Sequence, residues 1–283
     1  MPAPVDSLTS PTLKHLRERW WNDEFTHFLA ERLRPRPGNR ILDVGCGEGL
    51  AEVSLGRLQL SQIKLAGIDL FPHKVEQARR EAASHNLRVL LAAADAVRLP
   101  FRDGCFDSTY CVAVLQHLAD VDAAVAELAR VTRPHGRVVA VEPDNAARYV
   151  YSSLPNGAAL FEAAEALFAA VADGRRERSD AVVGPKLPER FARYSIEPVE
   201  VRVFPVSHAW LGSPPAAVWT ERRAAMAAAL DGAADAAVSA LAKRYFALFD
   251  AYQTDADRAG DAFVEIQSTP LFATVGQRLG RAN

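Results

Sequence analysis

Several features that would assign a chain to a specialised class are missing from this sequence. The three cysteines, Cys46, Cys105 and Cys111, have neither metal-ligand nor iron–sulfur spacing, and their odd number argues against a disulfide framework. No apolar run reaches the roughly 18 residues that a membrane span needs. The first residues also lack the basic and apolar regions of a signal peptide. We therefore expect a cytoplasmic protein that has no membrane partner and no metal site.

The sequence also lacks an excess of charge of either sign. The formal net charge is −2, which gives no basic footprint for nucleic acid or for an anionic membrane. The hydrophobic fraction of 49% and the charged fraction of 24% are ordinary for a globular protein. A chain of 283 residues can bury a substantial core, and we find no internal repeat or low-complexity linker.

Hydrophobic periodicity predicts strands that alternate with helices in the first half of the chain. The expected strands are 41–45, 64–70, 87–94, 106–112 and 137–142. The expected helices are 12–34, 49–58, 72–84 and 120–131. Strands joined through helices form right-handed crossovers, and these give a parallel sheet covered on both faces. The fold class expected is α/β, with a doubly wound, mostly parallel sheet.

The pattern changes after residue 145, where alanine-rich helical stretches interrupt the remaining strands. We expect residues 1–145 to hold an N-terminal helix and the first half of the sheet. Residues 146–283 should complete the same sheet with about 186–206 and 266–279, and carry helical insertions at about 146–185 and 207–265. The amphipathic faces of these insertions need an apolar surface to cover. We expect them to form a cap over the sheet, with Phe161, Phe168 or Trp210 lining a substrate cavity.

The stretch ILDVGCGEGL at 41–50 places three glycines, Gly45, Gly47 and Gly49, at alternate positions after an apolar run. Glycine packs no side chain and costs backbone entropy, so this spacing indicates that something approaches the backbone closely. Ligands of open α/β sheets bind beyond the carboxyl ends of the strands, where backbone N–H groups and the next helix dipole suit a polar ligand. A dinucleotide loop would have G-x-G-x-x-G, but Leu50 occupies its third glycine position.

Acidic residues follow the same strands. Asp69 ends the second strand, where a carboxylate can accept hydrogen bonds from both ribose hydroxyls, and Asp95 ends the third, where it could meet an adenine amino group. Asp43 lies just before the glycine loop. Each of these residues could instead cap a helix. Together, three carboxylates would repel a pyrophosphate, so they favour a cationic adenosine ligand.

Four segments in order, ILDVGCGEG, AGIDL, ADAVRLPFRDGCFDSTYCVAVLQHL and RVTRPHGRVVAVEP, resemble the successive motifs of class I S-adenosylmethionine-dependent methyltransferases. The resemblance covers about residues 20–145, and it is weaker in 186–206 and 269–278. It implies a seven-stranded Rossmann-like fold, S-adenosyl-L-methionine as the cofactor and a small-molecule methyl acceptor. One departure is His135, which stands where the family usually has a second glycine and affects only a turn.

The resemblance also implies roles for individual residues. The Gly45-Cys46-Gly47 backbone would hold the methionine end of the cofactor, Asp69 the ribose and Leu70 the adenine face. Asp95 and the backbone of Ala96 would read the adenine edge. Further residues could lie near the methionine moiety or close over the site, and they are Cys111, Gln116, His117, Arg19, Trp20 and Trp21.

No catalytic base can be assigned from the sequence, although His117 and Glu142 are candidates because both follow strands that end at the expected mouth. A nucleic-acid or protein methyltransferase is one alternative. Amino-methylating DNA enzymes of this fold carry an Asn/Asp-Pro-Pro-aromatic signature where this chain has Cys111-Val112-Ala113-Val114. A non-catalytic module that binds S-adenosylmethionine is another alternative. The acceptor atom cannot be identified from the sequence.

Overall fold

The computed structural model describes residues 20–58, 62–174, 180, 182–230 and 235–280. These residues form two compact units. We call the first the sheet unit, and its described parts lie within 20–146, 179–205 and 270–283. We call the second the helical unit, and its described parts lie within 147–178 and 206–269. Arg19, the start of the expected 12–34 helix and most of the charged stretch 174–180 lie outside the described residues.

The sheet unit is built on five parallel strands. They are β1 (Arg40–Val44), β2 (Lys64–Asp69), β3 (Val89–Ala93), β4 (Phe106–Val112) and β5 (Thr132–Pro143), in the order β3-β2-β1-β4-β5. The C-terminal part of β8 (Val264–Arg278) pairs antiparallel with β5, and β7 (Ile196–Leu211) pairs with β8. This sheet confirms the doubly wound, mostly parallel α/β fold.

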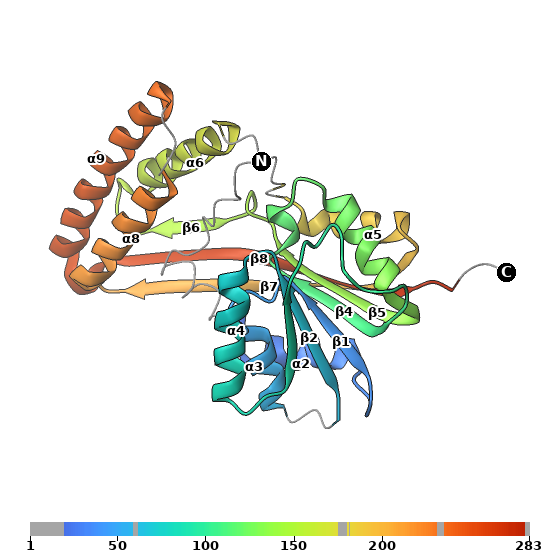
Figure 1. The fold of residues 1–283 in the computed structure, drawn as a ribbon. Helices are drawn as coiled ribbons and strands as arrows, with labels where there is room; N and C mark the ends of the chain where they lie inside the picture. The colour runs from blue at the N-terminus through green and yellow to red at the C-terminus, as the bar shows by residue number, and fades with distance from the viewer. Residues whose placement is uncertain (1–19, 59–61, 175–179, 181, 231–234, 281–283) are drawn as a thin grey trace. The chain divides into compact units, whose positions relative to one another are not determined.

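Helices cover both faces of this sheet. The helices are α2 (Asp23–Leu33), α3 (Leu50–Arg57), α4 (Pro72–Ser84), α5 (Val121–Val131) and α7 (Leu187–Arg193), with 3-10 turns η1 (Leu115–His117) and η2 (Gly184–Lys186). Figure 1 shows α3 and α4 on one side of the parallel strands and α5 on the other. Apolar residues of β1 alternate between the faces, so Leu42 and Val44 pack with Val125 and Leu128 of α5 in one buried core.

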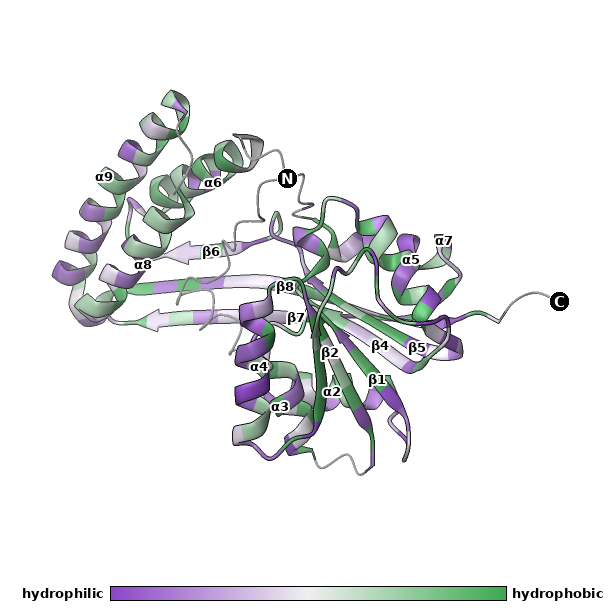
Figure 2. Cartoon of the chain, in the orientation of Figure 1, coloured by the Kyte–Doolittle hydropathy of each residue, from purple (hydrophilic) through white to green (hydrophobic). Residues whose placement is uncertain are grey.

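The helical unit has a separate apolar core. It contains α6 (Gly157–Gly174), α8 (Ala216–Ala229), α9 (Ala236–Ala259), the 3-10 turn η3 (Gly260–Ala262) and β6 (Tyr149–Ser152), which pairs antiparallel with residues 265–268 of β8. Fully buried Trp219, Phe249 and Tyr252 meet edge to face at the centre of this core. Figure 2 shows hydrophilic residues along the outer part of α9 and along α4. Among the described helices, none is long and apolar enough to cross a membrane.

Candidate functional site at the carboxyl ends of the parallel strands

The backbone N–H groups of the glycine loop (residues 45–49) donate hydrogen bonds to acceptors within the protein. The N–H groups of Gly45 and Cys46 both donate to the Ile68 carbonyl oxygen, at 2.7 and 2.8 Å. The Gly47 N–H donates to Asp69 Oδ2 at 3.0 Å, and the Gly49 N–H to the Cys46 carbonyl oxygen at 3.0 Å. We had expected these N–H groups to face a ligand, and that expectation is wrong for these four. A phosphate site needs outward N–H donors, so this loop is poorly suited to a phosphate.

Gly45 and Gly47 both adopt positive φ, at 83° and 54°, but their surroundings differ. A Cβ on Gly45 would lie 2.3 Å from Cγ2 of Val114, so the chain after β4 packs directly on this glycine. A Cβ on Gly47 would meet no atom within 4 Å. The loop is therefore packed on one side at Gly45 and bordered by open space at Gly47, where a ligand can approach.

Asp69 connects the end of β2 to the glycine loop. Its Oδ2 accepts the Gly47 N–H, and its Oδ1 accepts the N–H of Phe71 at 3.0 Å. A carboxylate has about four acceptor positions, so two remain for ribose hydroxyls. The next residue, Leu70, is 45% exposed although it is apolar, which suits contact with an aromatic base. Asp69 does not cap a helix through its side chain, so the alternative of a simple N-cap does not apply to it.

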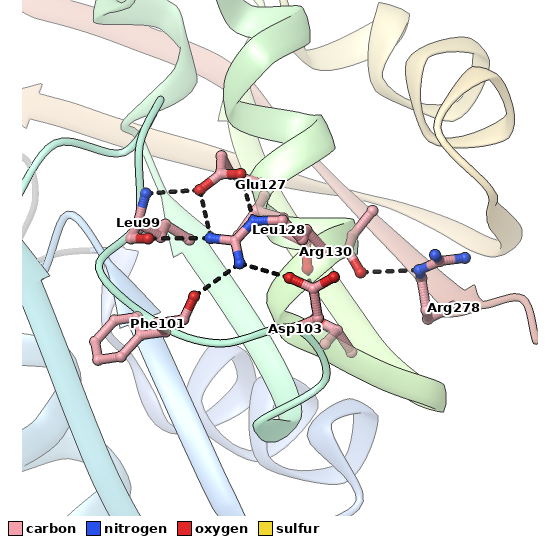
Figure 3. Close-up of polar contacts among 9 residues, drawn as sticks. Leu99, Phe101, Asp103, Glu127, Leu128, Arg130 and Arg278 are labelled. Atoms are coloured by element: carbon pink, nitrogen blue, oxygen red, sulfur yellow. Dashed lines mark hydrogen bonds and ion pairs between the residues drawn. The ribbon is translucent and has the colours of Figure 1, made fainter.

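The loop after β3 holds the residues expected at the adenine edge. Asp95 is exposed, and its Oδ1 accepts the Val97 N–H at 3.0 Å, while Ala96 is buried beneath. Arg130 of α5 anchors the continuation of this loop, as Figure 3 shows. Its guanidinium donates to the carbonyl oxygens of Leu99 (3.0 Å) and Phe101 (2.7 Å) and to the carboxylate of Asp103. Glu127 orients Arg130 from the same helix and accepts the Leu99 N–H at 2.7 Å.

Glu142, a candidate for acid–base chemistry, instead supports the loop after β4. It is fully buried, and its two oxygens accept the backbone N–H groups of Val114 (2.8 Å), Leu115 (2.7 Å) and Gln116 (3.3 Å). The carboxylate oxygens are therefore engaged by the backbone of this loop. The geometry therefore assigns Glu142 to loop positioning and corrects our expectation that it faces an open mouth.

The remaining candidates near the same loop differ in exposure. The Cys111 side chain is fully buried in the core, so it has no surface for a ligand. Gln116 is half-buried, and its Oε1 accepts a hydrogen bond from Asn145 Nδ2 at 2.9 Å. His117 is exposed at the end of η1. Trp20 and Trp21 are half-buried, and Trp21 packs on Phe25 of α2 with ring centroids 5.0 Å apart. The roles of Gln116, His117 and the tryptophans stay predictions.

Asp43 lies beneath the loop in a buried acidic group that sequence reasoning missed. Glu52 of α3 and Tyr110 of β4 are buried beside it. Burial and the neighbouring Glu52 charge raise the pKa of Asp43 well above its usual range, and burial raises the pKa of Glu52 to about 7. In the sequence, Glu52 is one polar residue in a short amphipathic helix, a pattern that predicts exposure, so no local signal indicated its burial.

Comparisons with known proteins show similarity to methyltransferases. Residues 42–140 match the family model described as a methyltransferase domain. An O-methyltransferase of Pyrenophora dematioidea is 36% identical over 118 residues, which cover 41% of this chain and 43% of that protein. A 27-O-demethylrifamycin SV methyltransferase of Amycolatopsis mediterranei is 32% identical over 146 residues, covering 47% of this chain and 52% of that protein. The solved structure of the cyclase SpnF has the same fold, with a TM-score of 0.56 at 21% identity over 97% of this chain and 94% of that one.

Residues 42–140 thus match a methyltransferase domain, and the strand order and the glycine loop are those expected from the sequence resemblance to class I S-adenosylmethionine-dependent methyltransferases. The residues present fit the cofactor of that class. The open space at Gly47, the exposed Leu70 and the spare acceptor positions of Asp69 lie at one edge of the sheet. The chain spans about half the length of the two curated relatives described above.

Proposed function

We propose that the protein transfers the methyl group of S-adenosylmethionine to a small-molecule acceptor. The observation that carries this proposal is the glycine loop itself, whose N–H groups are used within the protein while carboxylates lie beside and beneath it. Such surroundings favour a ligand with positive charge over a phosphate. The printed names of the relatives, an O-methyltransferase and a 27-O-demethylrifamycin SV methyltransferase, support a small-molecule acceptor for this chain. The formal net charge of −2 argues against nucleic acid.

When bound, S-adenosylmethionine would supply a methyl group on a sulfonium, which is already a good leaving group. The protein then has to bind and orient the two reactants, because positioning alone supplies on the order of 7–11 kcal/mol in well-oriented systems. In this proposal Asp69 binds the ribose hydroxyls, Leu70 contacts the adenine face, and Asp95 with the Ala96 backbone reads the adenine edge. Residues of the helical unit would select the acceptor. A cytoplasmic location stays a prediction from the sequence.

Calorimetry on the full chain tests the proposal through Asp69. We expect S-adenosylmethionine and S-adenosylhomocysteine to bind with one-to-one stoichiometry, and Asp69→Ala to weaken both about ten- to hundredfold. Loss of a charged acceptor for two hydroxyl donors costs about 1.5–3 kcal/mol. Glu76→Gln on the exposed surface of α4 is the control. Absence of binding to the wild-type protein, or unchanged binding to Asp69→Ala with an intact fold, would contradict the assignment.

A second candidate function is suggested by SpnF, because a cyclase has the same fold. The chain could bind S-adenosylmethionine without transferring its methyl group. Turnover separates the two functions. Release of S-adenosylhomocysteine in the presence of small hydroxylated or amino acceptors supports the methyltransferase, and cofactor binding with no turnover over a broad acceptor panel supports the non-methylating alternative.

A further inference from the structure

A row of residues crosses three strands beneath the glycine loop. Asp43 of β1 is the register partner of Gly67 in β2 and of Tyr110 in β4. Register partners in a sheet present their side chains to the same face. Glu52 of α3 reaches into this row, since its Oε1 lies 2.6 Å from the position that a Cβ on Gly67 would occupy. The missing side chain at Gly67 thus makes room for the Glu52 carboxyl beside Asp43.

The two carboxyls are buried, and the oxygens of one of them, Glu52, are unpartnered. Asp43 is 3% exposed and Glu52 is 1% exposed. Neither Glu52 oxygen has a hydrogen-bond partner of normal geometry, and the same holds for the buried Tyr110 hydroxyl that faces Asp43. A carboxylate only accepts hydrogen bonds, so two adjacent carboxylates repel each other and leave each other unsatisfied. One proton between them removes the repulsion and gives each carboxyl a partner.

Within this row, Glu52 is the group whose pKa lies near neutral pH. Burial raises the pKa of the Cys46 thiol and of the Tyr110 hydroxyl, so both stay neutral. The negative charge of Asp69, at the end of β2, raises the pKa values of both Asp43 and Glu52 further. On α4, Lys74 is a buried cation whose Nζ lies 5.1 Å from the Phe71 ring centroid. The pKa of Glu52, at about 7, is consistent with a proton held in the cofactor-free protein.

Resting on the proposed function, we propose that Asp43 and Glu52 share one proton in the cofactor-free protein and release it when a sulfonium cation binds at the adjoining loop. The proton passes to solvent, and no bond to the cofactor forms or breaks. An approaching positive charge stabilises the second carboxylate. The thioether product carries one positive charge fewer and releases less of this proton. Glu52 is therefore a specificity-determining residue, because it makes the loop favour the cationic cofactor over its product.

Calorimetry at pH 6 in two buffers of different ionisation enthalpy counts the protons released. We expect nearly one proton per S-adenosylmethionine bound to the wild-type protein, fewer for S-adenosylhomocysteine, and nearly none for Glu52→Gln. The affinity of the wild-type protein for S-adenosylmethionine should fall by up to about tenfold per pH unit below pH 7, whereas that of Glu52→Gln should stay nearly constant. Glu76→Gln, which removes an exposed carboxylate of α4, should behave as the wild type does.

The outcomes separate the inference from the function on which it rests. Binding of S-adenosylmethionine with equal heat in both buffers and equal affinity from pH 6 to 8 overturns the shared proton but leaves the proposed function intact. No binding of either compound at any pH overturns the proposed function as well. If Glu52→Gln does not fold, the number of protons that the wild type and Asp43→Asn release on binding S-adenosylmethionine decides whether the proton is shared. In the cofactor-free protein, a protonated-carboxyl infrared band at pH 6 that S-adenosylmethionine removes supports the proposal, and its absence contradicts it.

Discussion

At the scale of single residues, Glu52 imposes a pH-dependent stability on the fold. Its pKa in the folded protein is about 7, raised from an ordinary 4.5 mainly by burial. The folded state therefore binds the proton more tightly than the unfolded chain. This contribution to stability is fully present below pH 4.5 and is lost as the pH rises through 7. The difference corresponds to ~3 kcal/mol.

We expect Glu52→Gln to gain stability relative to the wild type as the pH rises from 5 to 8, by up to ~3 kcal/mol, because the amide has no proton to lose. Denaturant unfolding of both proteins at several pH values measures the difference. Glu81→Gln on the exposed part of α4 should show no such trend, since that side chain is half exposed. A stability difference between Glu52→Gln and the wild type that stays constant with pH would mean that Glu52 is ionised throughout.

At the scale of elements, α5 fixes the loop after β3 through Arg130. The planar guanidinium bonds two backbone carbonyl oxygens and two carboxylates in one arrangement (Figure 3). A lysine ammonium cannot reproduce this fork. We expect Arg130→Lys to destabilise the sheet unit by about 1–3 kcal/mol, to speed amide hydrogen exchange at Leu99, and to weaken cofactor binding.

Arg133 provides the matched control for Arg130. It is half exposed and pairs with Asp107 alone among the ion pairs of the described residues, and an exposed pair contributes about 0–1 kcal/mol. Arg133→Lys should therefore change neither hydrogen exchange nor cofactor affinity. Equal effects of the two substitutions would show that the loop does not depend on the guanidinium fork.

The accuracy of the sequence-based predictions also varied by element. The helix 72–84 and the strand 106–112 have the predicted bounds, because Pro72 marks a first helical turn and a short run rich in aromatic and β-branched residues marks a strand. The strand β6 was missed because Tyr149–Ser152 has only four residues and lies between loops. The strands β7 and β8 are longer than predicted, because β7 continues to Leu211 and β8 begins at Val264, where its first residues pair with β6.

The site was predictable where chemistry depends on position after a strand. The glycines and Asp69 meet at one edge because parallel strands end there together. The supports of the site were not predictable. Glu142 and Glu52 are buried through contacts with residues distant in the sequence, and a carboxylate in a sequence looks the same whether it binds a ligand or a backbone. Only the three-dimensional partners distinguish these cases.

At the scale of the whole molecule, we expect that damage to one unit lowers turnover without lowering cofactor affinity, which depends on the other unit. Trp219 is buried at the centre of the helical unit, where the Tyr252 hydroxyl also donates to Glu265 at 2.9 Å. Trp219→Ala should cost the helical unit about 3–5 kcal/mol. Because the candidate cofactor residues belong to the sheet unit, we expect S-adenosylmethionine affinity to be retained while turnover falls.

The same variant tests whether the helical unit selects the acceptor. Calorimetry and release of S-adenosylhomocysteine on the full chain measure binding and turnover separately. Thr220→Ala is the milder control, because Thr220 follows Trp219 on α8 but is exposed, and its loss leaves the core of the helical unit filled. Wild-type turnover by Trp219→Ala with a demonstrably loosened helical unit would place acceptor selection in the sheet unit.

The contrast between Gly45 and Gly47 has a consequence for how such chains diverge. Gly45 is required by the protein itself, because Val114 occupies the space that any side chain would need. Gly47 is bordered by open space, and its φ of 54° is one that asparagine or aspartate adopts with little strain. In a lineage that kept the fold but no longer used the ligand, selection would preserve position 45 and relax at position 47. A substitution of Gly47 is therefore the change expected first in a descendant that no longer binds the cofactor.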